Sequence, residues 1–106
     1  MEEKEEKNEY ALLQFERDYS SPDDKEGTQK FQKIIFYKLN EDGTFENGTT
    51  LEEMLRVTIE RLKDLNERFS CRENSLAITK CQEALFWLNE RTRDRIKRNV
   101  EGTHKA

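Results

Sequence analysis

Three arginines recur at helical spacing near the C-terminal end of this 106-residue chain. Arg91, Arg95 and Arg98 stand at i, i+4 and i+7, so one face of a helix would carry all three. A guanidinium group donates hydrogen bonds in a planar fork that matches a phosphate group. The spacing therefore predicts a face that binds a small anion. Cations in the last turns of a helix also stabilise its dipole, which explains Arg95 and Arg98 without a ligand but explains Arg91 less well.

Aromatic and amide side chains stand on the same predicted helix. Trp87 precedes Arg91 by four residues, so their side chains can touch. The pair is either simple cation–π packing or one wall of a purine pocket, and Phe86 and Trp87 can equally be core residues. Asn74 lies in the expected first turn, where its amide either reads a base or ribose edge or caps a backbone group.

The length of this helix limits how these residues can act together. Asn74 and Arg91 are 17 residues apart, which is about 25 Å along a helix axis. One chain could not hold a compact nucleotide with both side chains. If two copies pack with these helices antiparallel, Asn74 of one chain approaches Arg91 of the other. A two-fold dimer would then form two equivalent pockets.

Catalytic and metal-binding patterns are absent from the sequence. His104 is the one histidine and lies in the expected C-terminal tail. No nucleophile elbow, phosphate-binding glycine loop or paired-carboxylate site is recognisable. Cys71 and Cys81 would lie about 15 Å apart on one helix, too far for a disulfide, and no zinc-ligand spacing occurs. We therefore expect a protein that is not an enzyme and that needs no cofactor or metal.

Two amphipathic helices are expected to position the binding residues. Apolar residues repeat at helical spacing after two alternative capping boxes, Thr49 with Glu52 or Thr50 with Glu53. This first stripe comprises Leu51, Met54, Leu55, Ile59, Leu62, Leu65 and Phe69. A second capping box, Ser70 with Glu73, starts the next helix, for which Gly102 is a plausible stop. Helices with almost no linker predict an antiparallel hairpin.

The N-terminal part has the composition of β-structure. Residues 1–9 are nearly all charged or polar and are expected to form a tail. Residues 10–19 fit a strand or a short helix, and the strand is favoured because residues 31–39 are rich in β-branched and aromatic side chains. Residues 20–30 predict a loop. Asp42-Gly43 and Asn47-Gly48 predict tight turns, with a short return strand over 44–46.

These elements predict an α+β fold with a small N-terminal antiparallel β-hairpin or sheet followed by an antiparallel two-helix hairpin. The expected organisation is one domain over 1–106, with a charged tail (1–9), a β-rich part (10–48) and the helical hairpin (49–102). Only 33% of the residues are hydrophobic. A monomeric core would be marginal at this size, which favours a homo-oligomer.

Charge and hydropathy exclude other classes of partner. The net charge is −4, whereas proteins that bind duplex nucleic acid usually carry a strong positive excess. No apolar run is long enough to span a bilayer, and the N-terminal residues lack a signal-peptide core. We expect a cytoplasmic protein with no DNA, RNA or membrane partner.

A family resemblance lies mainly in the second helix. The residues that carry it are Arg72-Glu73-Asn74, Ala77-Ile78-Thr79-Lys80, Glu83-Ala84, Trp87, Arg91-Thr92, Arg95 and Val100-Glu101-Gly102-Thr103. This combination resembles the hairpin domain shared by phage anti-Thoeris and anti-CBASS proteins, the nucleotide sponges. The expected β-structure before the hairpin is more similar to the anti-Thoeris branch.

The resemblance implies that the protein sequesters a signalling nucleotide in the cytoplasm of the infected bacterial host. Such proteins hold cyclic ADP-ribose isomers without cleaving them, and some also bind cyclic oligonucleotides. By motif, the implied pocket residues are Asn74, Arg91 and Arg95, with Phe69 as an adenine-stacking ring. Three alternatives remain: a sponge for cyclic di- or trinucleotides, a helical module whose arginines meet an acidic protein, and a hydrolase of the signal.

Overall fold

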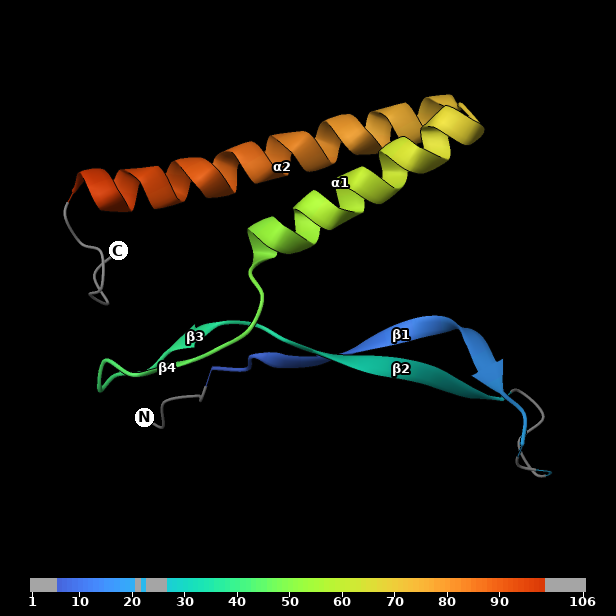
Figure 1. The fold of residues 1–106 in the computed structure, drawn as a ribbon, viewed down its shortest axis with the longest axis horizontal. Helices are drawn as coiled ribbons and strands as arrows, with labels where there is room; N and C mark the ends of the chain where they lie inside the picture. The colour runs from blue at the N-terminus through green and yellow to red at the C-terminus, as the bar shows by residue number, and fades with distance from the viewer. Residues whose placement is uncertain (1–5, 21, 23–26, 99–106) are drawn as a thin grey trace, which may run out of the picture. The chain divides into compact units, whose positions relative to one another are not determined.

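The structure is a computed structural model that describes residues 6–20, 22 and 27–98. The chain forms two compact units, one of strands and one of helices (Figure 1). The first holds β1 (Glu9–Asp18), β2 (Thr28–Ile35), β3 (Lys38–Leu39) and β4 (Phe45–Glu46). The second holds α1 (Leu51–Arg68) and α2 (Arg72–Lys97). The predicted α+β fold, with β-structure before a helical pair, is confirmed.

Strands β1 and β2 form an antiparallel ribbon in which Leu13 pairs with Phe31. The register shifts between Leu13 and Arg17, which marks a bulge in β1. The ambiguous segment 10–19 is therefore a strand. The tail expected over residues 1–9 extends too far toward the strand, because β1 already begins at Glu9. The residue before it, Asn8, also takes part in the β-structure, since its carbonyl accepts a hydrogen bond from the Phe36 amide (2.8 Å).

The single strand predicted over 31–39 is wrong, because it is divided into β2 and β3. The backbone changes partner at the division: the Phe36 amide donates to Asn8, whereas the Tyr37 amide donates to the carbonyl of Thr49 (2.8 Å). Strand β3 then pairs with the predicted return strand, β4. Gly43 lies between them with φ 88°, as the predicted Asp42-Gly43 turn requires.

Gly48 permits a close approach of two backbone segments and does not form the turn predicted for Asn47-Gly48. A Cβ atom at this position would lie 2.6 Å from the carbonyl oxygen of Ile35. Next to it, Thr49 forms a parallel bridge with Phe36, and the Thr49 amide donates to Ile35 (2.9 Å). The missing side chain therefore lets the segment that leads into α1 lie against the end of β2.

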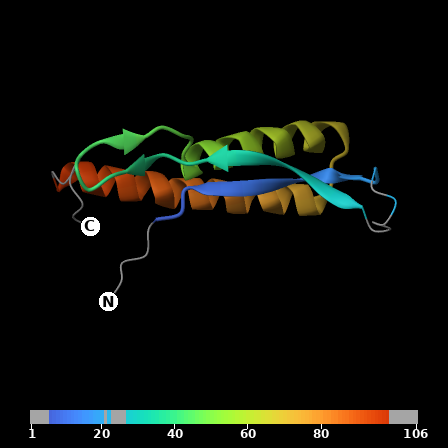
Figure 2. The same cartoon turned by 90° about the horizontal axis from the view of Figure 1, so that it is seen from below.

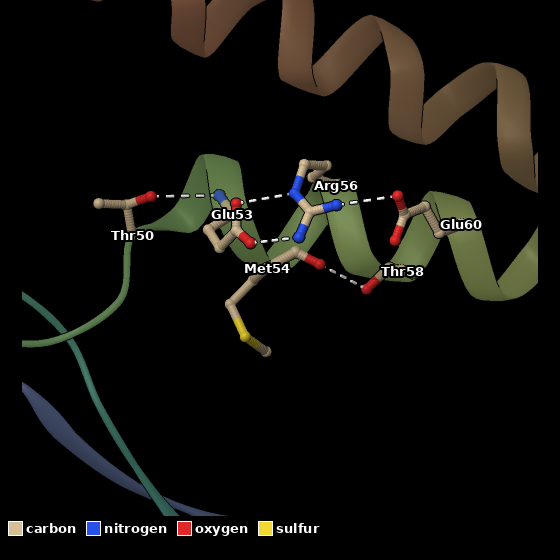
Figure 3. Close-up of polar contacts among 6 residues, drawn as sticks. All are labelled: Thr50, Glu53, Met54, Arg56, Thr58 and Glu60. Atoms are coloured by element: carbon tan, nitrogen blue, oxygen red, sulfur yellow. Dashed lines mark hydrogen bonds and ion pairs between the residues drawn. The ribbon is translucent and has the colours of Figure 1, made fainter.

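Helix α1 has Thr50 as its N-cap, in agreement with the second of the two predicted capping boxes, Thr50 with Glu53. The Thr50 hydroxyl accepts a hydrogen bond from the Glu53 amide (3.1 Å; Figure 3). The Glu53 carboxylate is directed along the helix, where it accepts from Arg56, whose guanidinium also donates to Glu60 (2.9 Å). The hydrogen bonds from Arg56 lower the pKa of Glu53. Only the threonine half of the capping box is therefore present.

Helix α2 is capped by Cys71, so the prediction of Ser70 as its cap was wrong by one residue. The Cys71 sulfur accepts a hydrogen bond from the backbone amide of Asn74 (3.4 Å), and the backbone amide of Cys71 donates to the side-chain oxygen of Asn66 (3.1 Å). This second bond fixes the connection to α1 and places Cys71 at the cap. Both cysteines are free. The predicted stop at Gly102 lies outside the described residues.

The two helices lie antiparallel and in contact along the hairpin (Figures 1 and 2). Among the described apolar side chains, Ile59 is the one that is buried, with 7% of its surface exposed. Helix α2 buries none of its residues, although it carries Leu76, Phe86, Trp87 and Ile96. The hairpin therefore exposes much apolar surface. No helix in the described part of the chain is long and apolar enough to cross a membrane.

Candidate functional site

The five predicted site residues fall into two groups at opposite ends of the helical hairpin. Phe69 and Asn74 lie at the connection between the helices. Trp87, Arg91 and Arg95 lie in the C-terminal half of α2, which runs beside the start of α1 (Figure 1). Because α2 is continuous from Arg72 to Lys97, about 25 Å separates Asn74 from Arg91 along its axis. One chain does not bring the two groups together.

Hydrogen bonds of both backbone and side-chain groups hold the residues at the connection. Phe69 caps the C-terminus of α1, where its amide donates to the carbonyl of Leu65 (2.8 Å), and 79% of its surface is exposed. Asn74 is half-buried, and its backbone amide donates to the Cys71 sulfur at the N-cap. The Asn66 side chain also donates to the hydroxyl of Ser75 (3.2 Å), which joins the two helices here. The connection thus presents an exposed aromatic ring and a half-buried asparagine.

The group near the C-terminus of α2 contains an ion pair between the helices. A terminal nitrogen of Arg91 lies 3.5 Å from a carboxylate oxygen of Glu52, in the first turn of α1. The side chain of Arg91 is 48% exposed and that of Glu52 is 26% exposed. Arg91 is therefore directed across the hairpin, with about half of its surface accessible to a ligand.

Trp87 has an aromatic neighbour on its own helix. Its ring lies edge-on to Phe86, with centroids 5.2 Å apart, and 68% of the residue is exposed. Among the described residues, Trp87 and Arg91 make no cation–π contact with each other. Of the two alternatives for Arg91 and Trp87, cation–π packing is therefore not formed in this structure, and the wall of a purine pocket stays a prediction. Trp87 presents an exposed ring one turn from Arg91.

The three spaced arginines differ in their partners. Arg91 pairs with Glu52, and Arg98 pairs with Asp94 one turn earlier on its own helix (2.9 Å). Arg95 is exposed and makes no ion pair with a residue that the structure describes. Arg98 is therefore engaged within its own helix, whereas Arg91 pairs across the hairpin and Arg95 has no charged partner among the described residues.

Glu52 is the polar neighbour of the site that sequence reasoning missed. It was considered only as a capping-box residue, because its position in a first turn has that ordinary explanation. An antiparallel hairpin nevertheless places the first turn of one helix opposite the last turns of the other. To predict that Glu52 pairs with an arginine near the end of α2, one would need to know how the residues of the two helices align along the hairpin.

Comparison with known proteins places this hairpin in a family. A family model described as "Acb2/Tad1, hairpin domain" matches residues 31–93, more than half of the chain. The chain belongs to the Acb2/Tad1 hairpin-domain family. The match runs from β2 into α2, so it includes all of α1 and α2 except the last four residues of α2. Four of the five predicted site residues lie inside it, and Arg95 lies two residues beyond it.

One relative carries a functional name. This Acb2/Tad1-family chain is 52% identical over 60 residues to a protein named "Thoeris anti-defense 1" from Bacillus phage SBSphiJ7. The aligned region is 56% of this chain and 42% of the relative. The chain thus matches less than half of the relative's length, and the match is strong within that part.

Proposed function

We propose that this protein is a phage anti-defence protein that binds and sequesters cyclic ADP-ribose-type signalling nucleotides and so keeps the Thoeris effector of the infected bacterium inactive. The observation that carries this proposal is the 52% identity to a phage protein named for anti-Thoeris activity. The protein acts in the host cytoplasm and holds its ligand without cleaving it. The accessible guanidinium groups of Arg91 and Arg95 supply positive charge for the negatively charged pyrophosphate of such a ligand.

The binding sites in this proposal lie between two copies of the chain. The groups at the two ends of the hairpin are about 25 Å apart in one chain, and antiparallel packing of two α2 helices joins one group from each copy. The exposed Leu76, Phe86 and Ile96 of α2 provide apolar surface for such contact. Burying that surface favours association, and the loss of translational and rotational freedom offsets part of the gain.

Each residue has a role that suits a dinucleotide-like ligand. Arg91 and Arg95 neutralise the pyrophosphate, since guanidinium groups bind phosphate oxygens in pairs. The exposed rings of Phe69 and Trp87 supply stacking surfaces for a base, and the Asn74 amide supplies a donor and an acceptor for its edge or for ribose. Enclosure between two chains slows ligand release, and slow release is what sequestration requires.

A thermal-shift assay with recovery of the ligand tests the proposal. The purified protein is incubated with a panel of cyclic ADP-ribose isomers and cyclic di- and trinucleotides, and its melting temperature is measured. Ligand at about 1,000 times its Kd stabilises the folded state by about 4 kcal/mol. The complex is then heat-denatured, and the released nucleotide is analysed. We expect a shift with a cyclic ADP-ribose isomer and recovery of that isomer intact.

The other outcomes identify other functions. A cleaved product indicates a hydrolase, and a shift with cyclic di- or trinucleotides alone indicates a sponge for CBASS signals. No shift with any nucleotide contradicts sequestration and favours a helical interaction module. We expect Arg91→Ala to abolish the shift. Arg93→Ala is the matched control, because Arg93 is exposed and paired with Glu90 on its own helix (2.8 Å), and it should retain the shift.

A further inference from the structure

The ion pair between Glu52 and Arg91 brings a carboxylate to the arginine that the proposed function assigns to the ligand. Its two atoms lie 3.5 Å apart and belong to residues 39 positions apart in the sequence. In the described part of the chain, two side-chain hydrogen bonds join α1 to α2: this one and Asn66–Ser75 at the connection. Arg91 is therefore already engaged by a negative group.

The neighbouring carboxylate does not share this contact. Glu53 is also in the first turn of α1, but it accepts hydrogen bonds from Arg56 on its own helix (2.8 Å; Figure 3). Two adjacent glutamates thus have different partners, one on α1 and one on α2. Glu52 is the less exposed of the two, with 26% of its side chain accessible against 48% for Glu53.

We propose that Glu52 is an internal counter-ion for Arg91, which an anionic ligand displaces, and that it thereby sets the affinity and charge preference of the site. This inference rests on the proposed function for the role of Arg91. A carboxylate and a phosphate accept from the same guanidinium donors, so they compete for them. After displacement, the carboxylate remains nearby and repels the bound anion.

The expected size of this effect follows from the exposure of the pair. Ion pairs between exposed side chains contribute little, and a change of this kind corresponds to about a two- to five-fold change in Kd. Glu52→Gln keeps the size of the side chain and removes its charge. We therefore expect it to bind anionic ligands more tightly, whereas a neutral ligand that gains nothing from Arg91 should bind with unchanged affinity.

The test compares Glu52→Gln with Glu53→Gln by isothermal titration calorimetry at physiological salt. The probes are inorganic pyrophosphate, the panel of cyclic ADP-ribose isomers, and adenosine as the neutral probe. Glu53→Gln removes the same charge from the same helical turn and should bind like the wild type, because the Glu53 carboxylate is engaged by Arg56 on its own helix and does not contact Arg91. The gain should also be smaller when Glu52→Gln is added to Arg91→Lys, which keeps the positive charge for binding but lacks the guanidinium donors that the carboxylate and the phosphate share. A general charge effect or altered folding would give the same gain in both backgrounds.

Two results separate this inference from the proposed function. If the wild type binds a cyclic ADP-ribose isomer but Glu52→Gln binds it equally or more weakly, the counter-ion inference is overturned and sequestration stands. If the wild type binds no isomer, the sequestration proposal fails, and the counter-ion inference is then decided by the pyrophosphate titration alone. A gain for pyrophosphate in Glu52→Gln that depends on Arg91 supports the inference. No gain, or no measurable binding by either protein, overturns it.

Discussion

Asn74 and Arg91 lie on one continuous helix, about 25 Å apart along its axis. A cyclic dinucleotide-like ligand is much shorter, so the two side chains can serve the same ligand only if they come from different copies. Their separation makes the shared-site proposal testable without a structure of the complex.

The first prediction is complementation between two inactive variants. Asn74→Ala and Arg91→Ala should each lose high-affinity binding, but a mixed dimer has one pocket that retains both side chains. After an equal mixture is unfolded and refolded together, about one quarter of the wild-type number of sites should return. Calorimetric stoichiometry with a cyclic ADP-ribose isomer measures this number. If no sites return although mixed dimers are present, the two residues do not contribute to one pocket from different copies.

The second prediction concerns the small core of the helical hairpin. Ile59→Ala removes the buried apolar side chain of α1 and should lower the free energy of unfolding by about 2–4 kcal/mol, because the cavity cannot fully collapse. Val57→Ala is the control, since Val57 on the same helix is 49% exposed and its truncation should change stability by about 0.5 kcal/mol or less. Urea denaturation at a fixed protein concentration measures both. Equal losses in the two variants would contradict the assignment of Ile59 as the core residue.

The helices and the Asp42-Gly43 turn could be predicted because their signals are local. The apolar repeat from Leu51 to Leu65 and the Thr50 cap involve residues within a few positions of each other, and the structure has both. Gly43 likewise has the positive φ that its turn requires. The identity of the cap of α2 depended on the Asn66 side chain, which holds the Cys71 amide from five residues away. That contact is not visible in a capping-box pattern.

The remaining errors concern contacts between distant segments. The division of the predicted strand at Phe36 and Tyr37 arises because Asn8 and Thr49, far apart in the chain, bind successive amides. The Glu52–Arg91 pair depends on how α1 and α2 align, which no local pattern specifies. The residues of the candidate site were chosen from their types and spacing, whereas the partners that the structure gives them could not be predicted from sequence. The assignment of the five residues to a ligand stays a prediction.

The third prediction tests the close approach at Gly48. Gly48→Ala would place a methyl group 2.6 Å from backbone atoms of Ile35 and Phe36, which cannot move aside as a side chain could. We expect a loss of about 1–3 kcal/mol in local stability, as for other overpacked sites. Hydrogen exchange should show faster exchange at the Tyr37 and Thr49 amides, which bond across this contact. Asn47→Ala, one residue earlier, should leave both amides protected. Unchanged exchange in Gly48→Ala would show that the segments do not approach closely.

The fourth prediction concerns acid stability and the pair formed by Glu53 and Arg56. Hydrogen bonds from Arg56 hold the pKa of Glu53 below its usual value of 4.5. The unfolded chain therefore binds this proton more readily than the folded chain, so the pair stabilises the fold above that pH and ceases to do so as pH falls through the folded-state pKa. The stability difference between wild type and Glu53→Gln should be largest near neutral pH and shrink below about pH 4.5. Urea denaturation across this range measures it. In an Arg56→Ala background, Glu53→Gln should lose this pH dependence, and a difference that persists there would assign the effect to another group.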